Sequence, residues 1–232
     1  MARTQLAQQL AEAAQELELD LPPERQALLL DYLAQMQRWN RTYNLTAIRD
    51  AEQMLVQHIV DSLAVVGPLR RALSDRDDAV IVDVGSGAGL PGVVLAVACP
   101  HWSIHCVDAV EKKMAFVRQM SGALGLANLR AVHGRIETMP SLQGDVVVSR
   151  AFASLLDFAT LAGRHARAGG MLAAMKGRHP EEEITALQSE GNWKVQSVQQ
   201  LQVPKLDAQR CLVWLGPVNA KRAAVKESHE SR

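Results

Sequence analysis

Apolar positions in the first third of the chain recur every three or four residues, which is the period of amphipathic helices. This pattern predicts helices before residue 22, over about 23–39 and over about 50–66. A proline suits the first turn of the second helix, because the N–H that it lacks would have no partner there. The polar residues 40–46 are expected to form a loop, and Gly67-Pro68 to end the third helix. We interpret residues 1–78 as a helical N-terminal extension.

From residue 79 onward, short apolar runs alternate with helical segments, as in parallel βαβ units. Strands are expected at 79–84, 103–108, 129–133, 145–149, 170–176, 194–203 and 210–215, and helices at 90–98, 111–124, 154–166 and 181–189. The last connection is too short for a crossover helix, so the last two strands should be antiparallel. The predicted fold class is α/β, a Rossmann-like and mostly parallel seven-stranded sheet. This core would span residues 79–216, and a polar, flexible tail would follow at 217–232.

Composition agrees with one large domain, or one domain with an appendage. The chain has 232 residues, of which 48% are hydrophobic and 4% aromatic, so the core is aliphatic. Lys+Arg and Asp+Glu both number 25, which does not favour nucleic-acid binding by the chain as a whole. Residues 80–232 nevertheless hold 17 basic and 13 acidic side chains, a weak indication of an anionic partner for the region with the predicted sheet.

The cysteines and histidines give no sign of a disulfide framework or a metal centre. Cys99, Cys106 and Cys211 show no paired spacing, which suits a reducing cytoplasm. His101 and His105 lie near two of them, but no four-ligand spacing exists, so no metal site is predicted. The N-terminus lacks the apolar run of a signal peptide, and no apolar stretch approaches the roughly 20 residues of a membrane span. We expect a soluble cytoplasmic protein.

The most specific short motif combines a strand, a glycine turn and the start of a helix at residues 81–92. Gly85, Gly87 and Gly89 stand at every second position, and glycine lets the backbone approach a ligand closely. The dinucleotide fingerprint GxGxxG has its third glycine where this chain has Leu90. The spacing instead resembles motif I of the S-adenosylmethionine-dependent methyltransferases with a Rossmann-like fold. The turn therefore predicts a site for S-adenosylmethionine.

Residues at the following strand ends extend this predicted site. Asp83, two positions before the first glycine, would help to hold the α-ammonium of the cofactor. Asp108 ends the second strand, where a carboxylate can accept hydrogen bonds from a ribose diol. Capping of the following helix is the alternative role for that carboxylate. Ile136 and Glu137 follow the third strand and would face the adenine, unless they form a charged surface turn.

Two basic residues end the fourth and fifth strands. Ligands bind at the C-terminal edge of a parallel sheet, so we interpret Arg150 and Lys176 as catalytic-site residues and Arg150 also as a cofactor contact. For each of them, a surface ion pair is the alternative. His58 and Asp61 lie one turn apart on a predicted helix, where a structural hydrogen bond or core packing is the favoured interpretation.

Further motifs together resemble one family over nearly the whole chain. They are Tyr43-Asn44-Leu45-Thr46, His58-Ile59-Val60-Asp61-Ser62, residues 83–92 and residues 149–155. The family is the bacterial small-subunit ribosomal RNA guanine-N7 methyltransferases, also called glucose-inhibited division protein B. The resemblance implies methyl transfer from S-adenosylmethionine to N7 of guanine 527 in 16S ribosomal RNA. It implies cofactor contacts at Gly85, Leu90, Ile136, Glu137 and Arg150.

This chemistry needs little acid–base catalysis, because guanine N7 carries a lone pair and no proton. The enzyme has to align the reacting atoms and exclude water, so Arg150 and Lys176 are expected to hold RNA phosphates or the guanine edge. The expected partner is 16S ribosomal RNA or the small subunit, with no DNA, membrane or obligate protein partner. Alternatives are a methyltransferase of this fold with another substrate, and a non-catalytic RNA-binding factor. Candidate RNA contacts are Arg38, Arg41, Lys112, Lys113, Arg135, Arg178, Lys205, Arg210, Lys221, Arg222 and Lys226.

Overall fold

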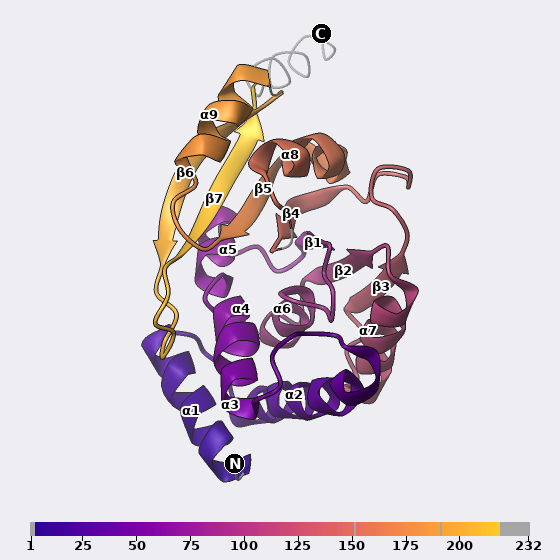
Figure 1. Ribbon diagram of the computed structural model, residues 1–232, viewed down its shortest axis with the longest axis vertical. Coiled ribbons are helices and arrows are strands. Elements are labelled where there is room, and N and C mark those ends of the chain that lie inside the picture. Colours follow the sequence, from indigo (N-terminus) through magenta and orange to yellow (C-terminus); the bar gives the residue numbers. More distant parts are fainter. Residues whose placement is uncertain (1–2, 151, 191, 219–232) are drawn as a thin grey trace, which may run out of the picture.

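The computed structural model describes residues 3–150, 152–190 and 192–218, and these build a seven-stranded sheet (Figure 1). Its spatial order is β3-β2-β1-β4-β5-β7-β6, and β7 runs antiparallel to both of its neighbours. The other pairs are parallel, so the predicted fold class is confirmed. The strands are β1 (Val80–Val84), β2 (Ser103–Asp108), β3 (Leu129–His133), β4 (Gly144–Ser149), β5 (Ala166–Lys176), β6 (Trp193–Leu201) and β7 (Arg210–Pro217).

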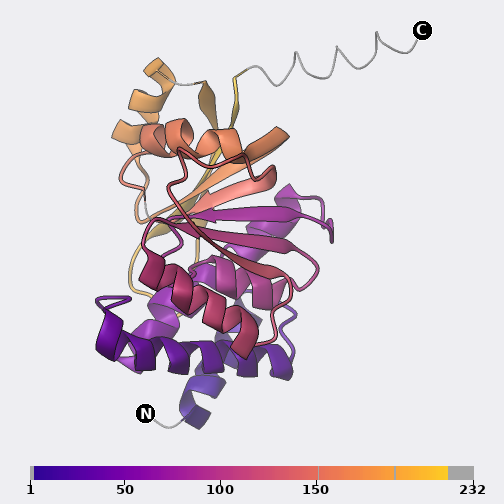
Figure 2. The ribbon, with the colours of Figure 1, turned by 90° about the vertical axis from the view of Figure 1, so that its right-hand side faces the viewer.

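Successive side chains of each strand point to opposite faces of the sheet, so the core consists of two layers. Ile81 and Ile104 point into one hydrophobic cluster, and Val82 and Val107 into the other, as the period of two requires. Figure 2 shows helices on both sides of the sheet. The first cluster includes residues of α6 (Gly92–Ala98) and α7 (Glu111–Ala123), and the second those of α8 (Leu155–Ala162) and α9 (Glu181–Glu190).

The N-terminal helices lie on the α6–α7 side. Leu10, Leu33 and Leu63 are buried in the same cluster as the sheet residues Ile81 and Ile104. This region and the sheet thus share one hydrophobic core, although the boundary at residue 78 stays a prediction. The elements are α1 (Arg3–Glu16), α2 (Pro23–Tyr43), α3 (Ala51–Met54), a π-helical turn (Leu55–Val60), α4 (Asp61–Leu63) and α5 (Val66–Ala72).

Two local predictions in this region are wrong. Helix α2 continues to Tyr43 instead of ending near residue 39, because Trp39 packs between Phe116 (ring centroids 5.3 Å apart) and Tyr43 (5.0 Å). Gly67-Pro68 does not end the third helix, because α4 already ends at Leu63 and these two residues lie in the first turn of α5, which begins at Val66. Proline is tolerated in a first helical turn, where its missing N–H costs no hydrogen bond.

Other elements agree with the prediction apart from their ends. The strands at 103–108 and 129–133 coincide with β2 and β3. Strand β5 begins at Ala166, so α8 is shorter than predicted and a single 3₁₀ turn follows it. Within the predicted tail 217–232, Pro217 still belongs to β7, and residues 219–232 lie outside the described residues.

Candidate active site

The glycine turn between β1 and α6 uses a backbone that other residues rarely adopt. Gly85, Gly87 and Gly89 have φ angles of 68°, 60° and 94°, all in the left-handed region. A Cβ at Gly89 would collide with the side chain of Val93, so this glycine lets the turn pack on α6. A Cβ at Gly87 would meet nothing within 4 Å, so the turn is open on that side. This opening leaves room for a ligand against the backbone.

Asp108 fixes this turn from the end of β2. Its Oδ2 accepts a hydrogen bond from Gly87 N at 2.9 Å, and its Oδ1 accepts one from Val110 N at 2.8 Å. The second bond lies just before α7, but Val110 is the N-cap residue of that helix and no side chain caps it, so the capping role considered for Asp108 is wrong. The carboxylate also lines a cavity beside the turn. Each oxygen retains acceptor capacity, so these two backbone bonds are compatible with a further hydrogen bond from a ribose hydroxyl.

Asp83 does not lie where a direct cofactor contact would require. Its side chain is completely buried beneath the turn, and Oδ2 accepts a hydrogen bond from Gly92 N at 2.8 Å. Burial raises the pKa of this carboxyl to about 7, and the hydrogen bond from Gly92 opposes that shift. The expectation that Asp83 holds the α-ammonium is therefore corrected. Asp83 supports the start of α6 from the core side.

One cavity of about 210 Å³ beside the turn collects most of the predicted adenosine-binding residues. Gly85, Asp108, Ile136 and Glu137 line it together, although they come from three different strand ends. Phe152 is a further lining residue that the sequence interpretation did not single out. Its ring lies 5.2 Å from that of Phe158 (centroid to centroid), so the cavity has an aromatic wall.

A second cavity, of about 220 Å³, also has Gly85 in its lining. The predicted residues Gly85, Gly87, Leu90 and Arg150 line it. Gly89 lines neither of these two cavities and serves the packing of the turn. The two cavities share Gly85 as a lining residue, so both lie next to the glycine turn.

The N-terminal region supplies part of the lining of the second cavity. This contribution was not predicted from the sequence. Leu45, Thr46 and His58 line this cavity. Asn40 holds the loop in place, because its side chain accepts from Thr46 N (2.9 Å) and donates to the Ile48 carbonyl (3.1 Å). The motifs at residues 43–46 and 58–62 indicated that these segments are important. A local motif does not reveal, however, which distant part of the chain its residues contact.

Helix α2 also contacts the turn directly. The buried hydroxyl of Tyr32 donates a hydrogen bond to the Ala88 carbonyl at 2.7 Å. An unsatisfied carbonyl in the core would cost roughly 1–3 kcal/mol, so this bond couples the position of the turn to that of α2. The N-terminal region is thus part of the site.

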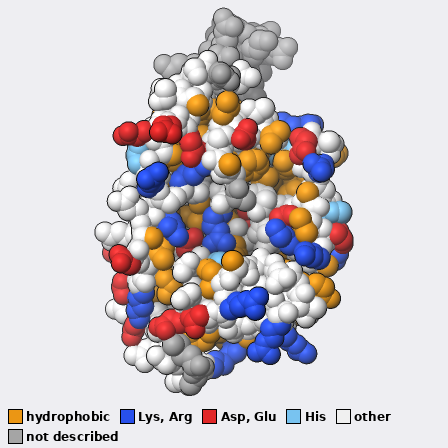
Figure 3. Space-filling model, viewed as in Figure 1, with side chains coloured by type: hydrophobic (Ala, Val, Ile, Leu, Met, Phe, Trp, Pro, Cys, Tyr) orange, Lys and Arg blue, Asp and Glu red, His pale blue; other side chains and the backbone are white. Residues whose placement is uncertain are grey.

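A third cavity, of about 380 Å³, adjoins the second through His58 and Arg150, which line both. Lys176 and Arg210 line it as well, from the end of β5 and the start of β7. Figure 3 shows basic side chains around a hollow near the middle of the molecule's face. The predicted pair Arg150 and Lys176 is therefore brought together at one cavity.

Lys176 is already engaged within the chain. Its Nζ donates to the carbonyl oxygens of Phe152 (3.0 Å) and Ala153 (3.3 Å), and it pairs with Glu183 at 2.7 Å. These contacts hold the segment after β4, which carries the aromatic wall of the first cavity. The ion pair considered as the alternative for Lys176 is present.

His58 forms structural hydrogen bonds, as its favoured interpretation predicted. Nε2 lies 2.8 Å from Thr46 Oγ1, and Nδ1 lies 3.1 Å from the Gln57 carbonyl. Burial, and then the nearby charge of Arg150, lower the pKa of His58 to about 4. The imidazole is therefore neutral near pH 7, so it does not compete with Arg150 for an anion.

The depressed pKa of His58 makes folding stability depend on pH. The unfolded chain binds the proton near pH 6.5 and the folded chain only near pH 4, so stability from this group is complete above pH 6.5 and is lost as the pH falls towards 4. Between pH 7.5 and pH 5, the wild-type protein should lose about 2 kcal/mol more unfolding free energy than His58→Gln. Urea unfolding of both proteins at the two pH values measures this double difference. Equal losses would contradict the assignment.

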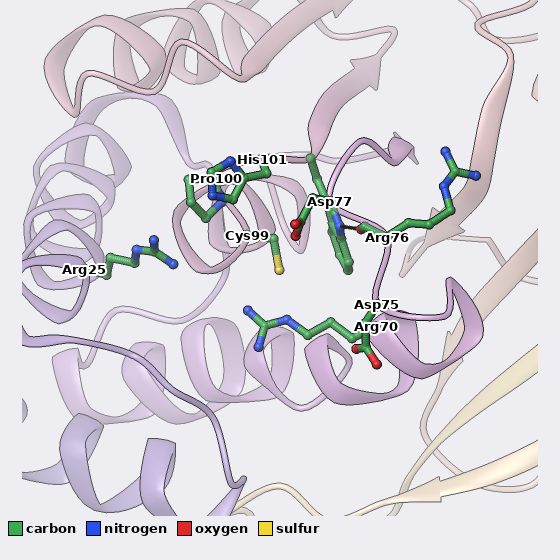
Figure 4. Close-up of a pocket in the computed structure, with 9 residues that line it drawn as sticks. Arg25, Arg70, Asp75, Arg76, Asp77, Cys99, Pro100 and His101 are labelled. Atoms are coloured by element: carbon green, nitrogen blue, oxygen red, sulfur yellow. Dashed lines mark hydrogen bonds between the residues drawn. The ribbon is translucent and has the colours of Figure 1, made fainter.

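A cavity of about 270 Å³ lies away from these residues, near the amino ends of β1 and β2 (Figure 4). Arg25 and Arg70 point towards one another there, and both donate to the Ala98 carbonyl, at 3.1 Å and 3.2 Å. They satisfy the C-terminal end of α6, where cations are favoured. This cavity contains none of the predicted site residues.

The residues that line the cavities at the turn suit S-adenosylmethionine in their chemistry. The open side of Gly87 accepts a ligand against the backbone, and Asp108 offers a carboxylate at the cavity for a diol. Arg150 brings a positive charge to the other end, which suits a carboxylate group. Among the described residues, no group of three or more His, Cys, Asp or Glu side chains could hold a metal ion.

Solved structures share this fold. A SAM-dependent methyltransferase from Aquifex aeolicus has a TM-score of 0.51 at 18% identity, covering 67% of this chain and 92% of that one. A variant of the 16S rRNA (adenine(1408)-N(1))-methyltransferase from Catenulisporales acidiphilia, solved with SAM, has a TM-score of 0.50 at 21% identity, covering 66% and 91%. These likenesses show the fold alone. None of the helices in the described ranges is long and apolar enough to cross a bilayer.

Sequence relatives are much closer. Ribosomal RNA small subunit methyltransferase G of Bordetella petrii is 67% identical over 187 residues, which are 81% of this chain and 73% of the relative. The protein of the same name from Methylibium petroleiphilum is 52% identical over 211 residues, 90% of this chain and 94% of the relative. The family model GidB, rRNA small subunit methyltransferase G, matches residues 25–213. This chain belongs to the rRNA small subunit methyltransferase G family.

Proposed function

We propose that this protein transfers the methyl group of S-adenosylmethionine to N7 of guanine 527 in 16S ribosomal RNA. The observation that carries the proposal is a set of three neighbouring cavities with shared lining residues: Gly85 lines both cavities at the glycine turn, and Arg150 and His58 line both the second of these and the basic cavity. Family membership supports the choice of ribosomal RNA. The atom N7 and the position 527 rest on the resemblance of the motifs.

The residues of this chain act by positioning. When bound, S-adenosylmethionine supplies an electrophilic methyl group on a sulfonium. Asp108 would bind the ribose, Phe152 and Ile136 would enclose the adenine, and Arg150 would bind the carboxylate. Because N7 has no proton to lose, the reaction needs no general base, and His58 with a pKa of about 4 would be only a weak one. Alignment and exclusion of water supply the rate acceleration.

The RNA would approach the edge of the sheet that carries Arg150. Among the predicted contacts, Arg135 lines the cavity at the turn, and its side chain is 74% exposed with a long ion pair of 3.6 Å to Glu137. Lys205 is less suitable, because it pairs with Glu12 of α1 at 2.6 Å. The predicted contacts Lys221, Arg222 and Lys226 lie outside the described residues. We expect 16S ribosomal RNA or the small subunit as cytoplasmic partner, without DNA, membrane or an obligate protein partner.

Mass mapping of 16S ribosomal RNA tests the proposal. RNA from cells that lack this protein should carry an unmodified guanine at position 527, and expression of the wild-type chain should restore 7-methylguanine there. Purified protein with S-adenosylmethionine should methylate RNA or small subunits from the deficient cells. A normal modification in cells without the protein, or label at another nucleotide only, would refute the proposal.

A further inference from the structure

Asp61 joins two arginines from different strands. Its side chain is almost completely buried, and it begins α4 directly after the π-helical turn. Oδ1 accepts a hydrogen bond from Arg210 Nε at 2.9 Å, and Oδ2 accepts one from Arg150 Nη1 at 3.3 Å. Arg150 follows β4 and Arg210 begins β7, and β5 lies between these strands. One buried carboxylate therefore fixes the distance between two guanidinium groups.

The two arginines face different spaces. Arg150 lines both the cavity along the turn and the basic cavity of about 380 Å³, so it is shared with the cofactor site. Arg210 lines the basic cavity, on the side of β7. Asp61 therefore holds two arginines with different surroundings. Arg150 lines the cavity at the turn as well as the basic cavity, and Arg210 lines the basic cavity.

Arg210 still has donors to offer. A guanidinium carries five N–H groups. Arg210 uses Nε for Asp61 and Nη1 for the Gln209 carbonyl at 2.9 Å, and in the described part of the chain its Nη2 has no hydrogen-bond partner. The side chain is 24% exposed, so the remaining N–H groups can reach a ligand in the cavity.

The charges of the cavity favour an anion. Arg150, Lys176 and Arg210 line it, against the single carboxylate of Asp61. Lys176 is neutralised by Glu183 at 2.7 Å, so one positive charge is left in excess among these five groups. The side chains of Asp61 and Arg210 are already fixed by their hydrogen bond, so little rotamer entropy remains to be lost when a ligand binds.

The same cavity has an apolar part. Ile48 and Met175 line it beside the neutral ring of His58. A flat, uncharged base fits these side chains, and a phosphate fits the arginine side. The cavity therefore combines the two surfaces that a single nucleotide needs.

We infer that Arg210, held in place by Asp61, binds the phosphate group of the nucleotide whose guanine enters this cavity. This inference rests on the proposed function, because it takes guanine as the base. Arginine suits this role because its planar guanidinium, a fork of N–H groups, can donate two parallel hydrogen bonds to two oxygens of one phosphate. Asp61 acts as a positioning residue that aims the fork.

Binding of guanosine, guanosine 5′-monophosphate and guanosine 3′-monophosphate to the protein with S-adenosylhomocysteine bound tests the inference. At least one monophosphate should bind wild-type protein about tenfold more tightly than guanosine, the gain typical of a charge-assisted hydrogen bond. This advantage should vanish in Arg210→Gln and fall in Asp61→Asn. Arg210→Lys should keep a part of it, because lysine keeps the charge but not the fork.

The matched control is Arg118→Gln, which also removes one arginine charge. The Arg118 side chain is 57% exposed on α7 and pairs with Glu111, so the monophosphate advantage should be unchanged. Equal binding of guanosine and both monophosphates to wild-type protein would overturn the inference, and so would an advantage that survives in Arg210→Gln. Parallel methylation of 16S ribosomal RNA separates the two proposals: binding preference without methylation would refute only the proposed function.

Discussion

Asp108→Asn is expected to weaken S-adenosylmethionine binding by about 100-fold, which corresponds to roughly 2.7 kcal/mol. The two carboxylate oxygens of Asp108 each accept a backbone hydrogen bond, from Gly87 and from Val110. Asparagine has only one oxygen, so its NH₂ group must face one of these N–H donors. The turn loses a restraint at the point where the cofactor lies, and the ribose loses a charged acceptor. Calorimetric titration with S-adenosylmethionine measures the change.

Glu111→Gln is the matched control for this prediction. It removes a carboxylate charge three residues further along the chain, from a side chain that is 56% exposed and pairs with Arg118 and His133. Its affinity for the cofactor should stay within about twofold of wild type, as expected for screened surface pairs. Urea unfolding without ligand shows whether Asp108→Asn also lowers stability. Unchanged cofactor affinity in a folded Asp108→Asn protein would contradict the assigned role.

Several predicted site residues that line the cavities at the turn belong to local sequence patterns. A strand, three alternating glycines and a helix follow one another within twelve positions, so their geometry depends on near neighbours. Asp108 and Arg150 were found by a similar argument, since the ends of parallel strands meet at one edge of a sheet. The alternation of short apolar runs with helical segments predicted this sheet.

The parts that were missed depend on contacts between distant residues. Tyr32 and Ala88, which are 56 positions apart, meet at the turn, and Asp61 and Arg210 are 149 positions apart. No spacing in the sequence reveals such a pair. For Asp83, the sequence predicted a ligand contact that the structure does not show. The prediction came from its position two residues before the glycine turn, but the alternation of side chains along β1 directs this carboxylate into the core. The wrong end predicted for α2 has a similar cause, since Phe116 of α7 packs on Trp39.

These distant contacts explain why the helical N-terminal region belongs to the site. His58, Thr46 and Leu45 form one wall of the cavity at the turn. Asp61 orients Arg150, which reaches the same cavity from the other side. The N-terminal region therefore contributes side chains both to the cavity at the turn and to the basic cavity, and the sheet region contributes the rest of each.

Arg150→Ala should have the largest effect on activity, lowering kcat/KM for methylation of 16S ribosomal RNA by about 1,000-fold, which is roughly 4.1 kcal/mol. Arg150 lines both the cofactor cavity and the basic cavity, so its loss removes a charge from two ligands at once. It also leaves the buried Asp61 with Arg210 as its remaining arginine partner. Single-turnover methylation and calorimetric titration of the cofactor measure the two effects separately.

A spectroscopic readout distinguishes this role from a general loss of structure. The charge of Arg150 contributes to the low pKa of His58, so Arg150→Ala should raise the pKa of His58, whereas Arg150→Lys should keep it low. Titration of the His58 ring signals by NMR follows this shift in the folded protein. Arg150→Lys should also recover a part of the methylation, because the charge remains and only the fork is lost. Full methylation activity and full cofactor affinity in Arg150→Ala would contradict the role assigned to Arg150. Neither the cofactor nor the RNA would then depend on its charge.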